Sequence, residues 1–302
     1  MHTSTALQNA IEALGVEVRK DVSLAQLSTF KAGGTAALLA KPISVGQLSQ
    51  LLTLCNEYGS RYFILGKGSN LLFADAGFDG VLVQLGGTLA GLTQEEGSTV
   101  KCGAGASLAE VCRTVAGWGL GGMEFAFGIP GSVGGAIYMN AGAYGGEIGQ
   151  VIKTVTYLTK TGEEKTISAQ ECAFAYRNSI FQKEEGCILS CTFNLEPANS
   201  TDVLAQMNII MQKRAEKQPL NLPSMGSAFK RPQGAYAAAL IEQCGLKGYR
   251  VGGAAISEKH TGFIVNLGGA TAADVISLAE YVAKTVYEKT GYVLEREFQV
   301  VE

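Results

Sequence analysis

The strongest chemical signal in this sequence is a glycine-rich run at residues 128–146, GIPGSVGGAIYMNAGAYGG. Seven of its nineteen residues are glycine, which adopts positive φ readily and lets a backbone approach another molecule closely. Apolar and aromatic residues such as Ile129, Val133 and Tyr138 stand between the glycines, whereas a flexible linker is polar. We therefore interpret the run as an ordered loop that cradles a nucleotide or a cofactor.

A second glycine-containing loop follows a short apolar segment at residues 62–65. The loop consists of Gly66, Lys67, Gly68, Ser69 and Asn70. It supplies backbone N–H groups, a lysine, a hydroxyl and an amide, all of which suit a diphosphate. Leu71 stands where a dinucleotide fingerprint has its third glycine, so the loop is not a Rossmann loop. A similar sequence at residues 103–108 is interpreted as a tight turn between a strand and a helix.

Two polar side chains occur in settings that a simple core would avoid. Arg177 lies inside the semi-apolar segment YRNSIF at residues 176–181. Ser227 lies in a proline-bounded loop at residues 223–232. Taken singly, each has a structural alternative: an arginine at the surface that pairs with Glu171, and a turn serine.

Two further motifs combine glycines or carboxylates with charge. Residues 245–253, GLKGYRVGG, form another glycine-rich loop with cationic side chains. Glu295 and Glu297 are two residues apart in an alternating segment, which would put both carboxylates on one face of a strand. That face is either exposed to solvent or directed into a cleft.

Composition restricts the classes of function. The chain has 302 residues, a net charge of −3 and 39 glycines, and only 17% of its residues are charged, against a usual value of about 25%. It contains no long basic run, so we expect no nucleic-acid partner. We find no signal-peptide pattern and no apolar stretch near the roughly 18 residues of a membrane helix. We therefore expect a cytoplasmic protein that does not insert into a membrane.

Cysteine and histidine usage limits metal and nucleophile chemistry. The seven cysteines are odd in number and scattered, which is typical of reduced thiols. Cys187 and Cys191 lie in a strand-like segment with no second ligand pair, so we expect no metal site. A mechanism based on histidine would have to use His2 or His260.

Apolar periodicity predicts the elements that position these motifs. Helices are expected at residues 4–14, 44–58, 107–117, 201–216, 237–244 and 271–289, the last of them ended by Gly291. Ser107 and Glu110 predict a capping box on the third helix. Strands are expected at residues 62–65, 81–85, 99–102, 151–160, 164–168, 187–195, 263–266 and 292–301. Because this order has no clean βαβ repeat, it favours the α+β class, with the main domain boundary near Pro219 and Pro223.

Together and in this order, the motifs resemble the UDP-N-acetylenolpyruvoylglucosamine reductase family, flavoenzymes that complete UDP-N-acetylmuramic acid in peptidoglycan synthesis. The resemblance runs from residues 28–34, STFKAGG, to Glu297, and it is similar to the shorter type of the family because nothing is inserted after residues 176–181. It implies an α+β chain with two FAD-binding subdomains of the vanillyl-alcohol-oxidase kind, at residues 1–90 and 91–218. A substrate-binding domain would occupy residues 219–302.

The resemblance also implies FAD as the cofactor and NADPH as the hydride donor. Some proteins of this fold attach flavin covalently through histidine, but neither histidine lies in the cofactor loops, so we expect non-covalent FAD. The diphosphate would rest on residues 66–70 and 130–135, and the flavin near residues 140–144. The implied cofactor-binding residues are Gly66, Lys67, Gly68, Ser69, Asn70, Pro130, Gly131, Ser132, Gly134, Gly135, Asn140, Ala141, Gly142 and Tyr144.

The implied reaction reduces the enolpyruvyl ether of UDP-N-acetylglucosamine. Hydride reaches the β carbon and a proton reaches the α carbon, through an enolate-like species whose charge requires a fixed cation and hydrogen-bond donors. By resemblance, Arg177 is the cation, a protonated Glu297 is a donor, and Ser227 gives the proton. Because serine has no convenient pKa for this role, its setting must activate it, through a nearby lysine or an ordered water.

The resemblance assigns substrate binding to Tyr176, Lys217, Lys230 and Arg231. The family often has asparagine at the position of Arg231, where the arginine would instead contact a phosphate. It also has proline at the position of Arg296, which leaves Glu297 matched. The tyrosine on the insertion of the longer type has no counterpart in this chain.

Two other functions remain open from the residues alone. An FAD oxidase of hydroxy acids or alcohols would share the fold but prefers a histidine or tyrosine base. A non-catalytic nucleotide-binding protein would keep the glycine-rich loops but would need neither Ser227 nor Glu297. For the reductase implied by the resemblance, we expect a monomer whose partners are small molecules, the enolpyruvyl sugar and NADPH.

Overall fold

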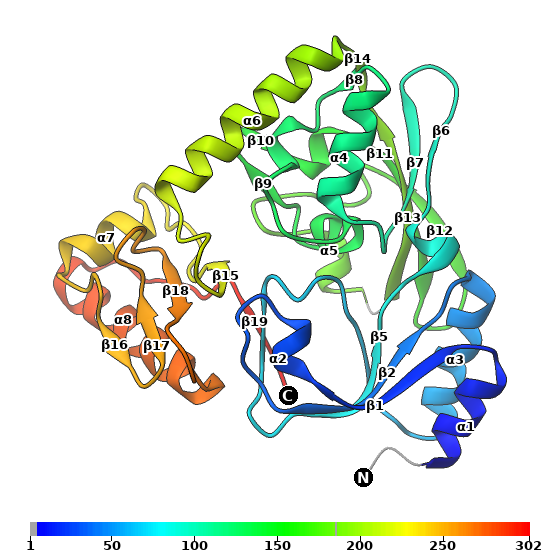
Figure 1. Cartoon of the computed structure of the whole chain (residues 1–302), viewed down its shortest axis with the longest axis horizontal. Helices are drawn as coiled ribbons and strands as arrows, with labels where there is room; N and C mark the ends of the chain where they lie inside the picture. The colour runs from blue at the N-terminus through cyan, green and yellow to red at the C-terminus, as the bar shows by residue number, and fades with distance from the viewer. Residues whose placement is uncertain (1–4, 185) are drawn as a thin grey trace. The chain divides into compact units, whose positions relative to one another are not determined.

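The structure is a computed structural model that describes residues 5–184 and 186–302, so His2 lies outside the described part. The chain divides into two compact units, and most of their helices and strands are labelled in Figure 1. Unit 1 comprises residues 1–20, 38–67 and 79–213, and unit 2 comprises residues 21–37, 68–78 and 214–302. Each unit is therefore assembled from segments that are distant in the sequence.

The first sheet has four strands in the order β1-β2-β5-β3. Its strands are β1 (Glu17–Ser23), β2 (Thr35–Lys41), β5 (Phe78–Val83) and β3 (Tyr62–Ile64). Two helices of unit 1, α1 (Thr5–Ala13) and α3 (Val45–Glu57), pack on each other. The buried face of α3 has the helical spacing expected from the sequence, with Leu48, Leu51, Leu52 and Cys55.

A five-stranded antiparallel sheet forms the centre of unit 1, in the order β12-β11-β13-β7-β6. Its strands are β12 (Glu164–Ser168), β11 (Ile152–Thr159), β13 (Gly186–Asn194), β7 (Thr99–Gly103) and β6 (Leu92–Gln94). Buried side chains such as Val155, Leu189 and Phe193 join this sheet to one continuous core. Figure 1 shows α4 (Leu108–Gly117) and α5 (Val133–Tyr138) beside the sheet.

Short elements complete unit 1. Two small sheets pair β8 (Leu120–Gly121) with β14 (Glu196–Pro197), and β9 (Gly142–Ala143) with β10 (Gly146–Glu147). The long helix α6 (Ser200–Lys217) follows β14 and continues into unit 2. Of these elements, β9 and β10 lie at the C-terminal end of the glycine-rich run.

Unit 2 contains a four-stranded sheet in the order β15-β18-β17-β16. Its strands are β15 (Ser224–Ser227), β18 (Phe263–Asn266), β17 (Ala254–Ile256) and β16 (Arg250–Val251). Figure 1 shows α8 (Ala272–Thr290) alongside β16 and β17, near α7 (Ala237–Gln243). The short helix α2 (Leu24–Leu27) and the parallel pair of β4 (Leu71–Phe73) with β19 (Gln299–Val301) complete the unit.

Most predicted elements are confirmed within one or two residues, and so is the α+β class, but two predictions are wrong. The strand expected at residues 292–301 is limited to β19, because its partner β4 is only three residues long. The capping box on α4 is absent: Ser107 occupies the N-cap without a side-chain hydrogen bond and forms a backbone bridge with Ser132 instead.

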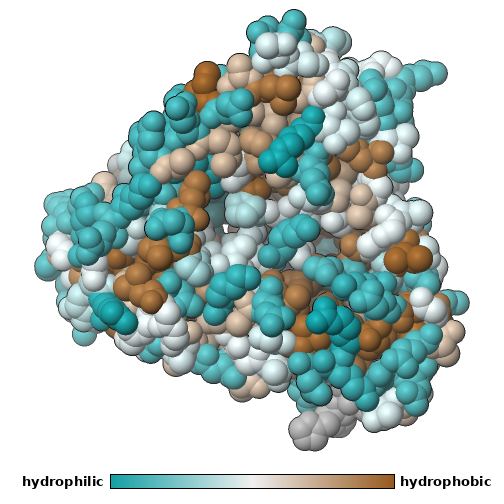
Figure 2. Space-filling model, in the orientation of Figure 1, coloured by the Kyte–Doolittle hydropathy of each residue, from teal (hydrophilic) through white to brown (hydrophobic). Residues whose placement is uncertain are grey.

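The surface in Figure 2 shows hydrophobic residues in small groups among hydrophilic ones. Among residues 5–184 and 186–302, no helix has both the length and the apolar character needed to cross a membrane. The same residues contain no group of three or more histidine, cysteine or acidic side chains arranged to hold a metal ion. All seven cysteines are buried and free.

Candidate active site

The glycine-rich run folds around the short helix α5. The hydroxyl of Ser132 accepts a hydrogen bond from the N–H of Gly135 at 3.3 Å and caps the helix. The turn at residues 103–108 braces this region, since the N–H groups of Val133 and Gly134 donate to Ala106 and Ala104 at 3.0 and 2.8 Å. The tight-turn interpretation of residues 103–108 is thus confirmed, and the turn holds the loop that precedes α5.

The structure brings Gly66 against this capped loop. A Cβ atom added at Gly66 would lie 2.6 Å from the Ser132 hydroxyl oxygen, so only glycine fits there without a shift. Lys67 beside it is exposed, and Pro130 and Gly135 are exposed as well. Two loops predicted to hold a diphosphate therefore meet within unit 1.

The rest of the second loop belongs to unit 2. Gly68 has φ +62° and packs on the backbone of Leu27, where a side chain has no room. Ser69 is half-buried, and the Asn70 amide donates to the carbonyl of Glu297 at 3.1 Å. Gly68 and Asn70 therefore have structural contacts within unit 2, in addition to any contact with a cofactor.

Asn140 braces the glycine-rich run from inside. The residue is 1% exposed, and its side-chain amide donates to the Ala175 carbonyl at 3.0 Å and accepts from the Gly149 N–H at 2.9 Å. Ala141 and Gly142 are half-buried, whereas Tyr144 is 48% exposed and has φ +52°.

Arg177 lies at the tip of a tight turn. Ala175 and Asn178 exchange two backbone hydrogen bonds, at 3.1 and 3.0 Å, so Tyr176 and Arg177 occupy the two central positions. The guanidinium lies 5.2 Å from the Tyr176 ring centroid, and Nη1 donates to the Gly142 carbonyl at 3.4 Å. The turn thus directs the predicted catalytic cation onto the glycine-rich run.

Glu171, the alternative partner of this arginine, has hydrogen-bond donors of its own in Ser168. Glu171 accepts from the backbone N–H and the hydroxyl of Ser168, at 2.8 and 2.7 Å. These hydrogen bonds lower the pKa of Glu171. The carboxylate therefore caps its own turn.

In unit 2, the structure brings Ser227 and Glu297 onto adjacent backbone. Ser227 ends β15 and lies opposite Phe263, and the N–H of Glu297 donates to the carbonyl of Ala228 at 2.9 Å. An isolated bridge between Phe229 and Arg296 extends this pairing. Residues separated by about 70 positions in the chain are thus held side by side.

The predicted phosphate and carboxylate ligands have separate surroundings. Lys230 forms an ion pair with Glu295 at 2.9 Å. The guanidinium of Arg231 lies 4.7 Å from the Tyr236 ring centroid. Lys217 is exposed at the end of α6. Exposed pairs of this kind contribute little stability, about 0–1 kcal/mol, so Lys230 can exchange partners readily.

His260 is partly buried beside β18. Its ring lies 4.9 Å from the Phe263 ring, and Nδ1 accepts from the Gly262 N–H at 3.2 Å. Burial lowers the pKa of His260. The sequence signal for this partial burial is the apolar segment that follows His260, because that segment forms β18, on which the imidazole ring packs.

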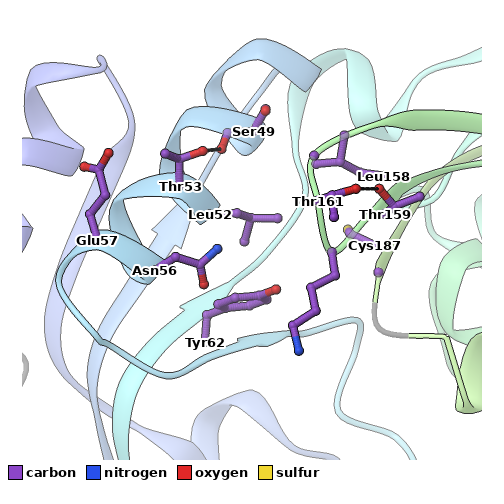
Figure 3. Close-up of a pocket in the computed structure, with 13 residues that line it drawn as sticks. Ser49, Leu52, Thr53, Asn56, Glu57, Tyr62, Leu158, Thr159, Thr161 and Cys187 are labelled. Atoms are coloured by element: carbon purple, nitrogen blue, oxygen red, sulfur yellow. Dashed lines mark hydrogen bonds between the residues drawn. The ribbon is translucent and has the colours of Figure 1, made fainter.

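A separate pocket of about 150 Å³ lies inside unit 1. Figure 3 shows Leu52, Asn56 and Tyr62 on one side and Leu158, Thr159 and Thr161 on the other. The hydroxyls of Thr159 and Thr161 bond each other at 2.9 Å. None of the predicted site residues lines this pocket.

Comparison with known proteins gives two matching family descriptions. Residues 36–168 match an FAD binding domain, and residues 218–301 match the C-terminal domain of UDP-N-acetylenolpyruvoylglucosamine reductase. The predicted fold, an FAD-binding fold of the vanillyl-alcohol-oxidase kind with a C-terminal substrate domain, is confirmed. FAD is accordingly the cofactor of this chain.

Individual relatives match over nearly the whole chain. The reductase of Lactiplantibacillus plantarum is 42% identical over 95% of this chain and 94% of its own length. That of Lachnoclostridium phytofermentans is 44% identical over 92% and 91%. The crystal structure of the reductase from Thermus caldophilus superposes with a TM-score of 0.80 at 33% identity, over 95% of this chain and 99% of the other. The chain therefore belongs to the UDP-N-acetylenolpyruvoylglucosamine reductase family of oxidoreductases in peptidoglycan synthesis.

Proposed function

We propose that this chain converts the enolpyruvyl ether of UDP-N-acetylglucosamine to UDP-N-acetylmuramate with NADPH as the reductant. The observation that carries the proposal is the pairing in unit 2, where Glu297 donates its backbone N–H to Ala228 next to Ser227. A proton donor and an acid are thereby held together by backbone. The same backbone is held by Asn70, which follows the glycines of the second loop.

Each of the three proposed catalytic residues has one task. Ser227 gives a proton to the α carbon of the substrate. Arg177 supplies a fixed positive charge for the carboxylate-stabilised anion that precedes this protonation. Glu297, protonated, donates a hydrogen bond to the same anion. Tyr176, Lys217, Lys230 and Arg231 would bind the substrate.

The loops proposed to hold FAD pack closely on their neighbours. Gly66 and Gly134 have space for a hydrogen but not for a methyl group, with Ser132 Oγ at 2.6 Å and Ala104 Cβ at 2.9 Å from an added Cβ. Lys67 and Gly135 stay exposed in these loops, where they can meet a diphosphate. When bound, FAD would relay hydride from NADPH to the substrate. The non-covalent attachment, the domain boundaries at residues 90 and 218, the monomeric state and the cytoplasmic location stay predictions.

The proposal is tested by following flavin absorbance without oxygen. One equivalent of NADPH should bleach the flavin, and the enolpyruvyl sugar should restore its colour. In Ser227→Ala, bleaching should keep its rate and recovery should slow at least about 100-fold, the usual share of a general acid. Ser277→Ala, at an exposed position of α8, is the matched control.

Three outcomes would contradict the proposal. Bleaching without recovery in the unmodified protein would reject the substrate. Bleaching by an alcohol or a hydroxy acid, and not by NADPH, would favour an oxidase. Loss of flavin from Ser227→Ala would make this serine structural.

A further inference from the structure

The turn that carries Arg177 is strained. Arg177 has φ +54°, a left-handed conformation that a side chain with a Cβ adopts at a cost. Six non-glycine residues with positive φ occur in the described chain, and four of them lie between residues 140 and 177. Such strain persists only where surrounding contacts hold the backbone.

One of these contacts is made by Gln182, five residues further along the chain. Its side-chain amide donates to the carbonyl of Arg177 at 2.9 Å and to the carbonyl of Tyr138 at 3.0 Å. Tyr138 is the last residue of α5, where helix carbonyls have no partner within the helix. The amide therefore joins the strained turn to the end of a helix.

The same end of α5 receives a second bond from the turn region. The hydroxyl of Ser179 donates to the Tyr138 carbonyl at 2.8 Å. Ser179 is fully buried, whereas Gln182 is exposed. Loss of the Gln182 amide would let water solvate both carbonyls, so the fold should survive while the turn is released.

We propose that Gln182 is a positioning residue that holds the left-handed turn and so aims the Arg177 guanidinium at the Gly142 carbonyl. This inference rests on the proposed function, because only there does Arg177 act as the cation. A fixed cation acts through its distance to the developing charge, and a displacement of about 1 Å can lower a rate 100-fold. Releasing the turn should therefore impair only the step that needs this charge.

The test substitutes methionine, which is similar in size and donates no hydrogen bond. Gln182→Met should slow flavin recovery by the enolpyruvyl sugar about 10- to 100-fold at saturating sugar. The half-saturating sugar concentration and the rate of bleaching by NADPH should each stay within about twofold of the values of the unmodified protein. The urea midpoint should be unchanged within experimental error. Gln182→Lys, which keeps a donor for both carbonyls, should recover most of the rate.

The matched control is Gln94→Met. Gln94 is also exposed in unit 1, and its amide donates to a loop carbonyl, that of Gly97, at 3.2 Å. This variant should recover at the normal rate. A slowed Gln94→Met would show that the effect of Gln182→Met is general, and would overturn the inference.

A double-mutant cycle separates the inference from the function on which it rests. In an Arg177→Ala background, Gln182→Met should slow recovery less than about twofold further. If Arg177→Ala alone leaves recovery unchanged, the assigned role of Arg177 falls, and the inference falls with it. If Arg177→Ala slows recovery but Gln182→Met does not, or acts equally in both backgrounds, only the inference is overturned.

Discussion

Replacement of Asn140 by alanine should destabilise unit 1 by about 3 kcal/mol, through two lost hydrogen bonds and one strained backbone angle. The bond to the carbonyl of the exposed Ala175 should cost about 1 kcal/mol, because water can replace it. The bond from the half-buried Gly149 N–H should also cost about 1 kcal/mol. Alanine at φ +41° adds roughly 1 kcal/mol, since asparagine tolerates this region better.

The assay is urea denaturation together with thermal unfolding. For a domain of this size, the expected loss corresponds to a Tm lower by roughly 6–12 °C, at about 2–4 °C per kcal/mol. Asn140→Gly should be about 1 kcal/mol more stable than Asn140→Ala, because glycine removes the backbone strain while losing the same bonds. Asn208→Ala, on the exposed side of α6, is the control and should change stability by less than about 0.5 kcal/mol.

Two results would refute this reasoning. If the free energy of unfolding of Asn140→Ala lies within about 0.5 kcal/mol of that of the unmodified protein, the hydrogen bonds of the buried amide do not stabilise unit 1. An alanine variant more stable than the glycine variant would mean that the positive φ is not a source of strain. Hydrogen exchange adds a local test, since the Gly149 N–H should lose protection in every Asn140 variant.

Three further changes test other parts of the molecule. Gly66→Ala should weaken FAD binding at least about tenfold in a fluorescence titration, because its Cβ would meet the Ser132 hydroxyl, whereas Gly46→Ala, at an open position, should not. Asp75→Ala should lower stability by about 1–2 kcal/mol in urea, because the carboxylate accepts hydrogen bonds at 2.7 and 3.1 Å from the first turn of α8; an unchanged midpoint would contradict this role. Burial lowers the pKa of His260, so the unfolded chain binds more protons here and stability should rise with pH up to about 6.5. His260→Gln should reduce that rise in urea midpoints measured between pH 5 and 7, and an unchanged slope would exclude His260 as its source.

Helices with strong local signals were predictable from the sequence. The helix expected at residues 271–289 is α8, and the expected stop at Gly291 has the left-handed φ of +75°. Its first turn carries a capping box between Thr271 and Asp274. Apolar spacing, caps and a terminal glycine all lie within a few residues of one another, so no distant contact is needed to recognise them.

Elements that depend on distant partners were not predictable in the same way. The alternating segment at residues 292–301 has the pattern of one strand, yet it is divided between a bridge to Phe229 and a short pairing with β4. Ser107 is of a residue type that commonly caps helices, but its side chain makes no capping hydrogen bond and its backbone forms a bridge with Ser132. In both cases, a pairing partner decides the local structure, and local spacing carries no information about that partner.

The candidate site shows the same division between residue type and geometry. The types of Arg177, Ser227 and Glu297 could be read from ordered motifs, whereas the strained turn and its support by Gln182 could not. A left-handed arginine has no sequence signature, because glycine and asparagine are the usual residues at such positions. The supporting residue is instead found from the two carbonyls that its amide binds.

The discontinuous make-up of unit 2 links the N-terminal quarter of the chain to residues near its C-terminus. The carboxylate of Asp75 caps α8, and the amide of Asn70 holds the carbonyl of Glu297. Residues 68–78 therefore support the backbone on which Glu297 is placed, although more than 200 positions separate them in the sequence. A change at Asn70 should then alter the unit that contains Ser227 and Glu297 as well as the loop that contains Gly66. For this reason, a loss of flavin after substitution of Asn70 cannot by itself identify a cofactor contact, whereas Gly66→Ala acts within unit 1, on the loop capped by Ser132.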